Sequence, residues 1–278
     1  MKIQYLGTAA AEGIPAVFCD CDVCKRSREA GGKNIRSRSQ AIIDDKILID
    51  FPCDTFYHTA LYGIELSKIS TCIITHNHQD HLYPEDFLML KKGFSHPEST
   101  KPFTVYATHP GYSQILCTTI PQNLENPDRL VVNKIEPFSP FEADGYKITP
   151  LKADHDPKCQ PVFYSIEKDG KAILYANDTG LFPEETIKYL KSNPVKYDLI
   201  SLDCTNMMLG IYYGSHMGLA ENIAIREKLI SWGCADENTK FVCHHFSHNG
   251  GGVTHDDFVP IAKKEGFDVS YDGLTIEV

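Results

Sequence analysis

A dense group of metal-binding side chain types constrains this chain more than any other feature. The segment His76-Asn77-His78-Gln79-Asp80-His81 holds four such side chains within six positions. It follows a β-branched run, so it is expected to lie in the loop that leaves a strand. Because alternate side chains of an extended segment point to one side, His76 and His78 are placed to chelate one ion, while Asp80 and His81 reach a second. The fold must therefore present this loop to a two-ion centre.

Further candidate ligands are spaced along the chain at the ends of expected strands. His155 follows one such strand, Asp178 follows another, and a third is followed by His244, His245 and His248. A carboxylate has two oxygens and a negative charge that offsets the repulsion between cations, so Asp178 is suited to bridge two ions. Asp50 ends a short apolar strand, and we expect it to hold a ligand histidine through the second ring nitrogen of that histidine.

Short β-rich runs alternate with helical patterns throughout the chain. The runs predict strands over 2–8, 40–44, 46–51, 71–75, 129–135, 146–152, 162–167, 172–176, 197–202 and 239–243. Helices are predicted over 84–92, 110–119, 183–191 and 217–230. In the last helix the expected buried stripe comprises Leu219, Ala220, Ile223, Ala224 and Ile230. The pattern indicates an α/β protein with two similar halves joined in one domain, residues 1–278.

The charge balance narrows the class of partner. The chain has 27 Lys and Arg residues against 37 Asp and Glu residues, a net charge of -10, which disfavours binding to nucleic acid. No apolar run approaches the roughly 18 residues needed to span a bilayer, and the first residues contain no secretory core. We therefore expect a cytoplasmic protein that acts on a small molecule rather than on a membrane, with a homodimer as a candidate assembly.

The order of the candidate ligands resembles that of the metallo-β-lactamase superfamily. Its five ordered motifs match Asp50, the 76–81 segment, His155, Asp178 and a terminal histidine at 244 or 245. This resemblance implies a four-layer αββα sandwich with a two-metal centre at one edge of the sheets. Composition and periodicity alone predict only an α/β fold.

Three cysteines crowd a short polar segment, Cys19-Asp20-Cys21-Asp22-Val23-Cys24, which we expect to be a loop. Thiols this close in sequence are poor disulfide partners, because the bridge strains a short loop, whereas a tetrahedral zinc ion needs only a fourth ligand. The segment is similar to the Cys-x-Cys-x-x-Cys loop of the phosphoribosyl 1,2-cyclic phosphate phosphodiesterase subfamily, in the carbon-phosphorus lyase pathway. That resemblance implies a structural zinc completed by His248, and it assigns the catalytic ligand position to His245.

The same subfamily resemblance singles out His216, which lies just before a late helix and would act as a general acid or phosphate ligand. An imidazole with an ordinary pKa near 6.5 can protonate a leaving alkoxide at neutral pH. Arg36 and Arg38 resemble arginines that follow the cysteine loop in relatives, with plain surface charge as the alternative interpretation. Cys159, four residues after His155, is a candidate for lining the site.

The sequence therefore predicts a metal-dependent hydrolase in which a hydroxide shared by two divalent ions attacks a small phosphodiester, cyclic ones included. Imidazole and carboxylate ligands suit zinc, manganese and iron, so the catalytic metals stay open, while the cysteine site favours zinc. The expected catalytic residues are Asp80 and His216. The expected ligands of the two-ion centre are His76, His78, Asp80, His81, His155, Asp178 and His245, and those of the structural zinc are Cys19, Cys21, Cys24 and His248.

Three alternative functions use similar residues. A carboxylic ester, thioester or lactone hydrolase would use the same centre on a carbonyl group, and replacing His216 should then matter less. A tRNA-processing nuclease shares the metal motif but conflicts with the acidic charge. A non-hydrolytic protein resembling the pyrroloquinoline quinone biosynthesis protein would keep the cysteine-bound zinc while its two-ion centre would be incomplete or act in oxygen chemistry.

Overall fold

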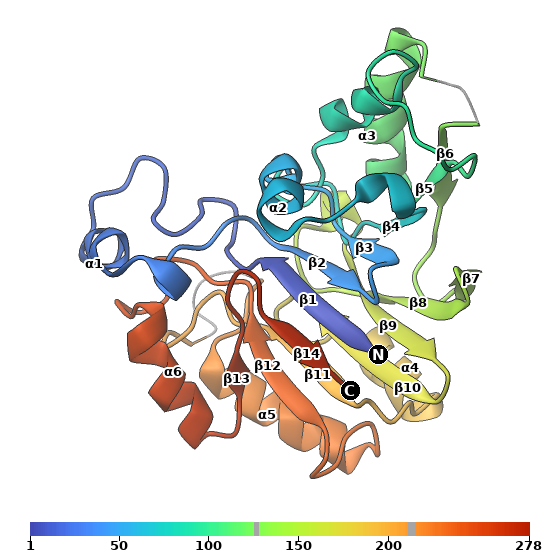
Figure 1. The fold of residues 1–278 in the computed structure, drawn as a ribbon. Helices are drawn as coiled ribbons and strands as arrows, with labels where there is room; N and C mark the ends of the chain where they lie inside the picture. The colour runs from blue at the N-terminus through green and yellow to red at the C-terminus, as the bar shows by residue number, and fades with distance from the viewer. Residues whose placement is uncertain (125–127, 211–214) are drawn as a thin grey trace.

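The computed structural model describes residues 1–124, 128–210 and 215–278, and within these ranges the strands form two seven-stranded sheets (Figure 1). The first sheet has the order β14-β1-β2-β3-β4-β5-β6 and the second β13-β12-β11-β10-β9-β8-β7. The strands of the first sheet are β14 (Thr275–Glu277), β1 (Lys2–Gly7), β2 (Gln40–Ile43), β3 (Ile47–Ile49), β4 (Thr71–Ile73), β5 (Phe103–Ala107) and β6 (Leu130–Lys134). Those of the second are β13 (Asp268–Val269), β12 (Lys240–His244), β11 (Leu199–Asp203), β10 (Lys171–Ala176), β9 (Val162–Lys168), β8 (Tyr146–Lys152) and β7 (Phe141–Ala143).

Helices cover the outer face of each sheet. The α-helices are α1 (Asp22–Ala30), α2 (Thr55–Tyr62), α3 (His109–Thr119), α4 (Glu184–Ser192), α5 (Leu219–Ser231) and α6 (His255–Lys264). Short 3-10 helices are η1 (Gly32–Asn34), η2 (Leu66–Lys68), η3 (Pro84–Leu90), η4 (Ile120–Gln122) and η5 (Pro157–Cys159). Helices α2 and α3 contact the first sheet, whereas α4, α5 and α6 contact the second (Figure 1).

Three apolar clusters fill the spaces between these layers. The central cluster joins the two sheets and includes Ile3 and Ile43 from the first and Ile148 and Ile173 from the second. A second cluster lies between the first sheet and its helices, and a third between the second sheet and α4, α5 and α6. Both faces of each sheet are thus buried, which is why the strands read as continuous apolar runs. The predicted α/β fold and its four-layer αββα arrangement are confirmed.

Strand direction brings the candidate ligands to one end of the sandwich. Strands β3 and β4 are parallel, as are β10, β11 and β12, and β8 runs in the same direction as β10 because each is antiparallel to β9. The two sheets are joined near this end, where Val162 N donates to Thr75 O and the Tyr164 hydroxyl donates to Ile74 O. The segments that follow these strands therefore meet at a shared edge.

The buried stripe predicted for the last long helix is right at Leu219 and wrong at Ala220, Ala224 and Ile230, which are exposed. Helix α5 buries Leu219, Asn222, Ile225 and Leu229, whereas the predicted stripe member Ile230 is 46% exposed. Hydrophobicity pointed to the wrong face because the inward face includes a polar residue: Asn222 Nδ2 donates to Cys243 Sγ on β12 at 3.6 Å. A buried amide with a hydrogen-bond partner can occupy a core position that a hydropathy pattern assigns to an apolar residue.

Two other local predictions differ from the structure. The helix predicted over 84–92 is the 3-10 helix η3, in which Pro84 and Phe87 are both buried; residues three apart share a face in a 3-10 helix. The cysteine segment is only partly a loop, because Cys24 lies in the first turn of α1. Helices α1, α2 and α6 and strands β5, β7, β13 and β14 were not predicted.

Among the described residues, the helices include none with both the length and the apolar character that crossing a bilayer requires.

Candidate metal centre

Three imidazoles converge where β4 and β8 end, and we call them the first donor set: His76, His78 and His155. His78 Nδ1 lies 2.9 Å from His76 Nε2 and 3.1 Å from His155 Nε2. A neutral imidazole has one donor and one acceptor nitrogen, so three ring nitrogens that face one another compete for protons. A divalent cation satisfies all three at once, because imidazole nitrogen is a preferred ligand of such ions. The donor chemistry of this set therefore fits a metal ion.

Four further side chains form the second donor set: Asp80, His81, Asp178 and His245. His81 Nε2 lies 2.7 Å from Asp178 Oδ2 and 3.2 Å from Asp80 Oδ2. His245 Nδ1 lies 3.0 Å from the other oxygen of Asp178, Oδ1. All four side chains are buried, so their charges are poorly screened by solvent.

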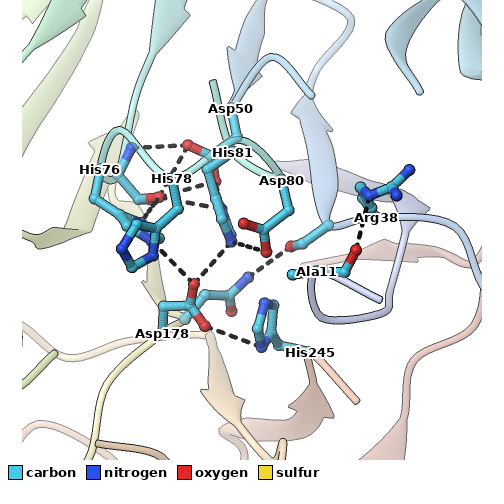
Figure 2. A network of polar contacts seen from close by, with 12 residues as sticks. Ala11, Arg38, Asp50, His76, His78, Asp80, His81, Asp178 and His245 are labelled. Atoms are coloured by element: carbon cyan, nitrogen blue, oxygen red, sulfur yellow. Dashed lines mark hydrogen bonds and ion pairs between the residues drawn. The ribbon is translucent and has the colours of Figure 1, made fainter. Parts of the chain in front are cut away.

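Asp178 is a member of the second donor set that also contacts the first, and Figure 2 shows its carboxylate between the histidine block and His245. Its Oδ2 lies 3.3 Å from His76 Nε2 in the first set and 2.7 Å from His81 Nε2 in the second. Asp178 also has a positive φ of 45°, an uncommon backbone state that turns the chain just beyond β10. The structure thus gives Asp178 the place that a bridging carboxylate would need.

The charges around these side chains are set by burial and by one another. Burial alone would raise the pKa of Asp178, but His245 and His81 outweigh it and hold that pKa well below its usual range. Burial and the neighbouring His81 lower the pKa of His76, which keeps its ring neutral and able to coordinate. For His81, burial is outweighed by surrounding carboxylates, Asp80 and Asp178 foremost, which raise its pKa. A cation held by the same carboxylates would take the place of that proton.

Unpartnered polar atoms provide a further test of whether the residues fit metal ions. Within the described part of the chain, the buried atoms His245 Nε2 and His155 Nδ1 have no hydrogen-bond partner. A buried polar atom without a partner is costly, so such atoms call for an explanation. His245 Nε2 is the relevant atom, since the other nitrogen of the same ring lies beside the buried Asp178 carboxylate, and this arrangement fits a site that takes a cation.

Asp50 contacts the ring nitrogen of His81 that faces away from Asp178. Its Oδ2 accepts a hydrogen bond from His81 Nδ1 at 2.7 Å, and its Oδ1 accepts from Thr75 N at 2.7 Å. His81 thus keeps Nε2 turned toward Asp178, since its other nitrogen is occupied. The structure places Asp50 in the predicted contact with the second ring nitrogen of a candidate ligand, an arrangement that fixes ring orientation.

The structure distinguishes between the paired histidines at the end of β12. Both ring nitrogens of His244 are occupied, Nε2 by the Ser39 and Tyr175 hydroxyls at 3.1 and 3.2 Å and Nδ1 by the Ser270 hydroxyl at 2.9 Å. His245, one residue later and with a positive φ of 61°, faces Asp178 instead. His245 therefore belongs to the candidate centre and His244 to the polar interior.

His216 lies beside the second donor set and is paired with Asp203, a residue that our sequence analysis missed. His216 Nδ1 lies 3.0 Å from Asp203 Oδ2 and 3.6 Å from Asp178 Oδ1. The backbone amides of Met217 and Thr205 donate to Asp203 Oδ1 and hold that carboxylate in place. Asp203 is the last residue of β11, so the strand-end rule that found Asp178 could have found it as well.

Nearby carboxylates, Asp203 foremost, keep His216 protonated. Burial alone would lower the pKa of His216, but Asp203, Asp178 and Asp80 together outweigh burial and raise that pKa to about 9. Because Nδ1 is engaged with Asp203, the proton available for transfer is the one on Nε2.

The three clustered cysteines and His248 converge at a separate place, which we call the cysteine cluster. His248 Nδ1 lies 3.4 Å from Cys21 Sγ and 3.7 Å from Cys19 Sγ. Burial alone would raise the pKa of Cys21, but hydrogen bonds from the Cys24 amide and from His248 lower it to about 6. All ten cysteines, each within the described ranges, are free thiols. Thiolate character together with four converging donors fits a tetrahedral zinc ion.

We expect Cys21→Ser to lower thermal stability far more than activity. An ion present at about 100 times its Kd contributes about 2.7 kcal/mol of stability, and its loss should lower Tm by about 5–10 °C in a chain of this size. Thermal unfolding followed by circular dichroism measures the shift. Cys117→Ser, which changes an exposed thiol on α3, is the matched control and should leave Tm unchanged. Equal losses of activity and stability would contradict a structural role.

The two arginines that resemble those of relatives are both engaged in the fold. Arg36 is buried, and its guanidinium donates to the Thr8 hydroxyl and to Ser270 O, each at 2.7 Å. Arg38 donates to Ala11 O, as Figure 2 shows, and pairs with Asp54 at 3.3 Å. The interpretation of Arg36 as surface charge is therefore wrong.

Comparisons with known proteins agree with this geometry. A model of the beta-lactamase superfamily domain matches residues 46–245, a range that includes every residue of both donor sets. An octanoyltransferase from Porphyromonas gingivalis is 33% identical over 84 residues, which are 30% of this chain and 16% of that protein. The matched segment is thus a small fraction of the length of this curated relative.

Solved structures share the fold over the whole chain. A diphosphatase of the PhnP family is 21% identical with a TM-score of 0.73, and the match covers 100% of this chain and 98% of that one. Zinc-bound PqqB from Methylobacterium extorquens is 18% identical with a TM-score of 0.71, covering 100% of both chains. The short form of human tRNase Z is 16% identical with a TM-score of 0.68, covering 100% of this chain and 99% of that one. At these identities the likeness concerns the fold alone.

Proposed function

Since this chain belongs to the beta-lactamase superfamily, we propose that it is a metal-dependent hydrolase that cleaves a small phosphodiester. The observation that carries the proposal is the position of Asp178 between two converging donor sets, with the His216–Asp203 pair beside it. Such a centre would combine two cation positions with a proton donor within one group of neighbouring side chains.

The proposed roles follow from these contacts. His76, His78 and His155 would hold one divalent ion, Asp80, His81 and His245 a second, and Asp178 would contact both. When bound, the ions would lower the pKa of a coordinated water towards neutrality and offset charge on the phosphoryl oxygens. Zinc, manganese and iron all suit imidazole and carboxylate ligands.

His216 is the proposed general acid. Its Nδ1 is engaged with Asp203, so protonated His216 presents the Nε2 proton to the departing ester oxygen. Asp203 acts through His216 by orienting the ring and stabilising its charged form. An alkoxide leaving group gains from such a proton far more than a phenolate does, because the alkoxide is the stronger base.

A small substrate is favoured over RNA because the chain carries a net charge of -10, which repels a polyanion. A carbonyl ester, thioester or lactone is the competing substrate class, since the same ions could polarise a carbonyl group. Hydrolysis of bis-p-nitrophenyl phosphate by the metal-loaded protein, with p-nitrophenyl acetate as the carbonyl comparison, distinguishes the classes. Activity on the acetate alone would overturn the phosphodiesterase proposal.

Metal content is the second test. We expect two ions per chain that a mild chelator removes, because the donor sets hold imidazole and carboxylate groups, and one that resists, because thiolates bind zinc more tightly. Elemental analysis before and after chelation measures the ions, and activity should return with manganese or zinc. A non-hydrolytic protein similar to PqqB would keep the resistant ion and show no metal-restored hydrolysis.

A further inference from the structure

A fourth group of metal-binding side chains, each of a different type, lies on the outer side of the first donor set. It consists of His78, Asp156 and Cys159, and we call it the rim cluster. His78 belongs to both groups: its Nδ1 faces His76 and His155, while its Nε2 lies 3.7 Å from Asp156 Oδ2. Cys159 Sγ lies 3.9 Å from Asp156 Oδ2. The three ligand atoms lie within 4.8 Å of one another.

These separations suit a cation. Ligand bonds to zinc of about 2.0–2.3 Å place tetrahedral ligand atoms about 3.3–3.7 Å apart. The distances from Asp156 Oδ2 to His78 Nε2 and to Cys159 Sγ, 3.7 and 3.9 Å, are close to that range, so only small side chain shifts are needed. An imidazole, a carboxylate and a thiol are also a ligand combination that favours thiophilic divalent ions, such as Zn²⁺ and Cd²⁺, over Mg²⁺ or Ca²⁺.

The local backbone preorganises the rim cluster. Asp156 is the N-cap of η5, and its Oδ1 accepts a hydrogen bond from Lys158 N at 3.0 Å, which leaves Oδ2 directed toward His78 and Cys159. The Thr108 hydroxyl donates to Cys159 O and braces the same turn. The side chains of His78 and Asp156 are 37% and 40% exposed, so an ion has access from solvent.

We propose that the rim cluster is a weak inhibitory site, through which excess Zn²⁺ or Cd²⁺ draws the His78 ring away from the catalytic centre. Binding forms bonds from the ion to Asp156 Oδ2, Cys159 Sγ and His78 Nε2. The thiol proton is released to solvent, while the His78 ring loses its Nε2 proton and takes up one at Nδ1, the nitrogen that leaves the catalytic ion, so the ring stays neutral. The site is weaker than the catalytic ones because it has three protein ligands, and one of them is shared. The inhibitory part of the proposal rests on the proposed function, since it takes His78 to be a catalytic ligand.

The test uses the protein with its catalytic and cysteine-cluster ions loaded. Cd²⁺ is added in excess, and the ultraviolet cadmium–thiolate absorption is compared between the wild type and Cys159→Ser. Zn²⁺ inhibition of bis-p-nitrophenyl phosphate hydrolysis is measured in the same proteins. Cys117→Ser, which alters an exposed thiol elsewhere, is the matched control. Asp156→Asn keeps the N-cap acceptor while removing the ligand charge, so it tests the site if Cys159→Ser folds poorly.

We expect Cys159→Ser to lose part of the cadmium absorption and to raise the Zn²⁺ concentration for half-inhibition by at least about tenfold, since even outer-shell partners change metal affinity by 10–100-fold. Asp156→Asn should raise it in the same direction, and Cys117→Ser should match the wild type. Identical absorption and inhibition in all four proteins would overturn the proposal. If Cys159-dependent absorption appears in a protein that hydrolyses no phosphodiester, the rim site stands and the proposed function fails.

Discussion

Replacing Asp178 with alanine should abolish phosphodiester hydrolysis, with a loss of about a thousandfold or more in kcat/KM. The physical reason is that one carboxylate contacts His76 in the first donor set and both His81 and His245 in the second. Without it, two cations would approach each other with no negative charge between them, and at least one should bind poorly. Steady-state kinetics with bis-p-nitrophenyl phosphate and elemental analysis of the same preparation measure both effects.

The fold should survive this substitution, because the sheets are held together by the apolar clusters rather than by the centre. Circular dichroism of the variant should match the wild type. Asp178→Asn, which keeps the side chain volume, should lose as much activity and so separates charge from packing. Asp268→Ala, an exposed aspartate on β13, is the control and should retain both ions and full activity. An Asp178→Ala protein that kept two exchangeable ions and its activity would refute the bridging role.

Replacing His216 with glutamine should slow hydrolysis by about 10²–10⁴-fold for substrates with an alkoxide leaving group, which is the usual contribution of a general acid. The same variant should lose much less activity on bis-p-nitrophenyl phosphate, because p-nitrophenolate departs without a proton. The comparison of the two leaving groups in the wild type and the variant is the measurement. Equal losses on both substrates would mean that His216 binds phosphate rather than transferring a proton.

Asp203→Asn tests the positioning role separately. Asp203 is the largest of the carboxylate contributions that raise the pKa of His216 to about 9, so its removal should lower that pKa. A general acid works only while it is protonated, and activity is lost as the pH rises through its pKa. The alkaline limb of the kcat profile should therefore move to lower pH in Asp203→Asn. An unchanged pH profile of kcat together with a lower Tm in Asp203→Asn would show that Asp203 has a purely structural role.

Local spacing was enough to predict the centre of the site. The 76–81 segment can be recognised as a ligand segment from the sequence. Side chains spaced two or three residues apart beyond a strand share one side of the chain, and this depends only on local backbone geometry. The order of Asp50, His155 and Asp178 along the chain resembles that of a known superfamily, and this resemblance predicted the four-layer fold. Most of the predicted strands lie within a residue or two of the observed bounds, because strands that are buried on both faces read as apolar runs.

Other residues depended on partners that are distant in sequence. His244 and His245 are the same residue type at adjacent positions, and only the hydroxyls of Ser39, Tyr175 and Ser270 around His244 show which one faces Asp178. The sequence does not distinguish Asp203 from the other aspartates; its role becomes visible only because β11 places it next to His216. The inward face of α5 was mispredicted because Cys243 on β12 provides a partner for Asn222.

The sequence by itself determined which side chains are available to bind cations and that the fold is α/β, because both follow from local spacing and from apolar runs. The sandwich was implied only by the order of the candidate ligands, through the family resemblance. Only the tertiary structure decided which of these side chains converge in one donor set, which are occupied by hydrogen bonds, and that His78 presents its second nitrogen to Asp156. The physical reason is that coordination depends on distances between atoms from several strands. Such distances are set by sheet packing, which no single segment specifies.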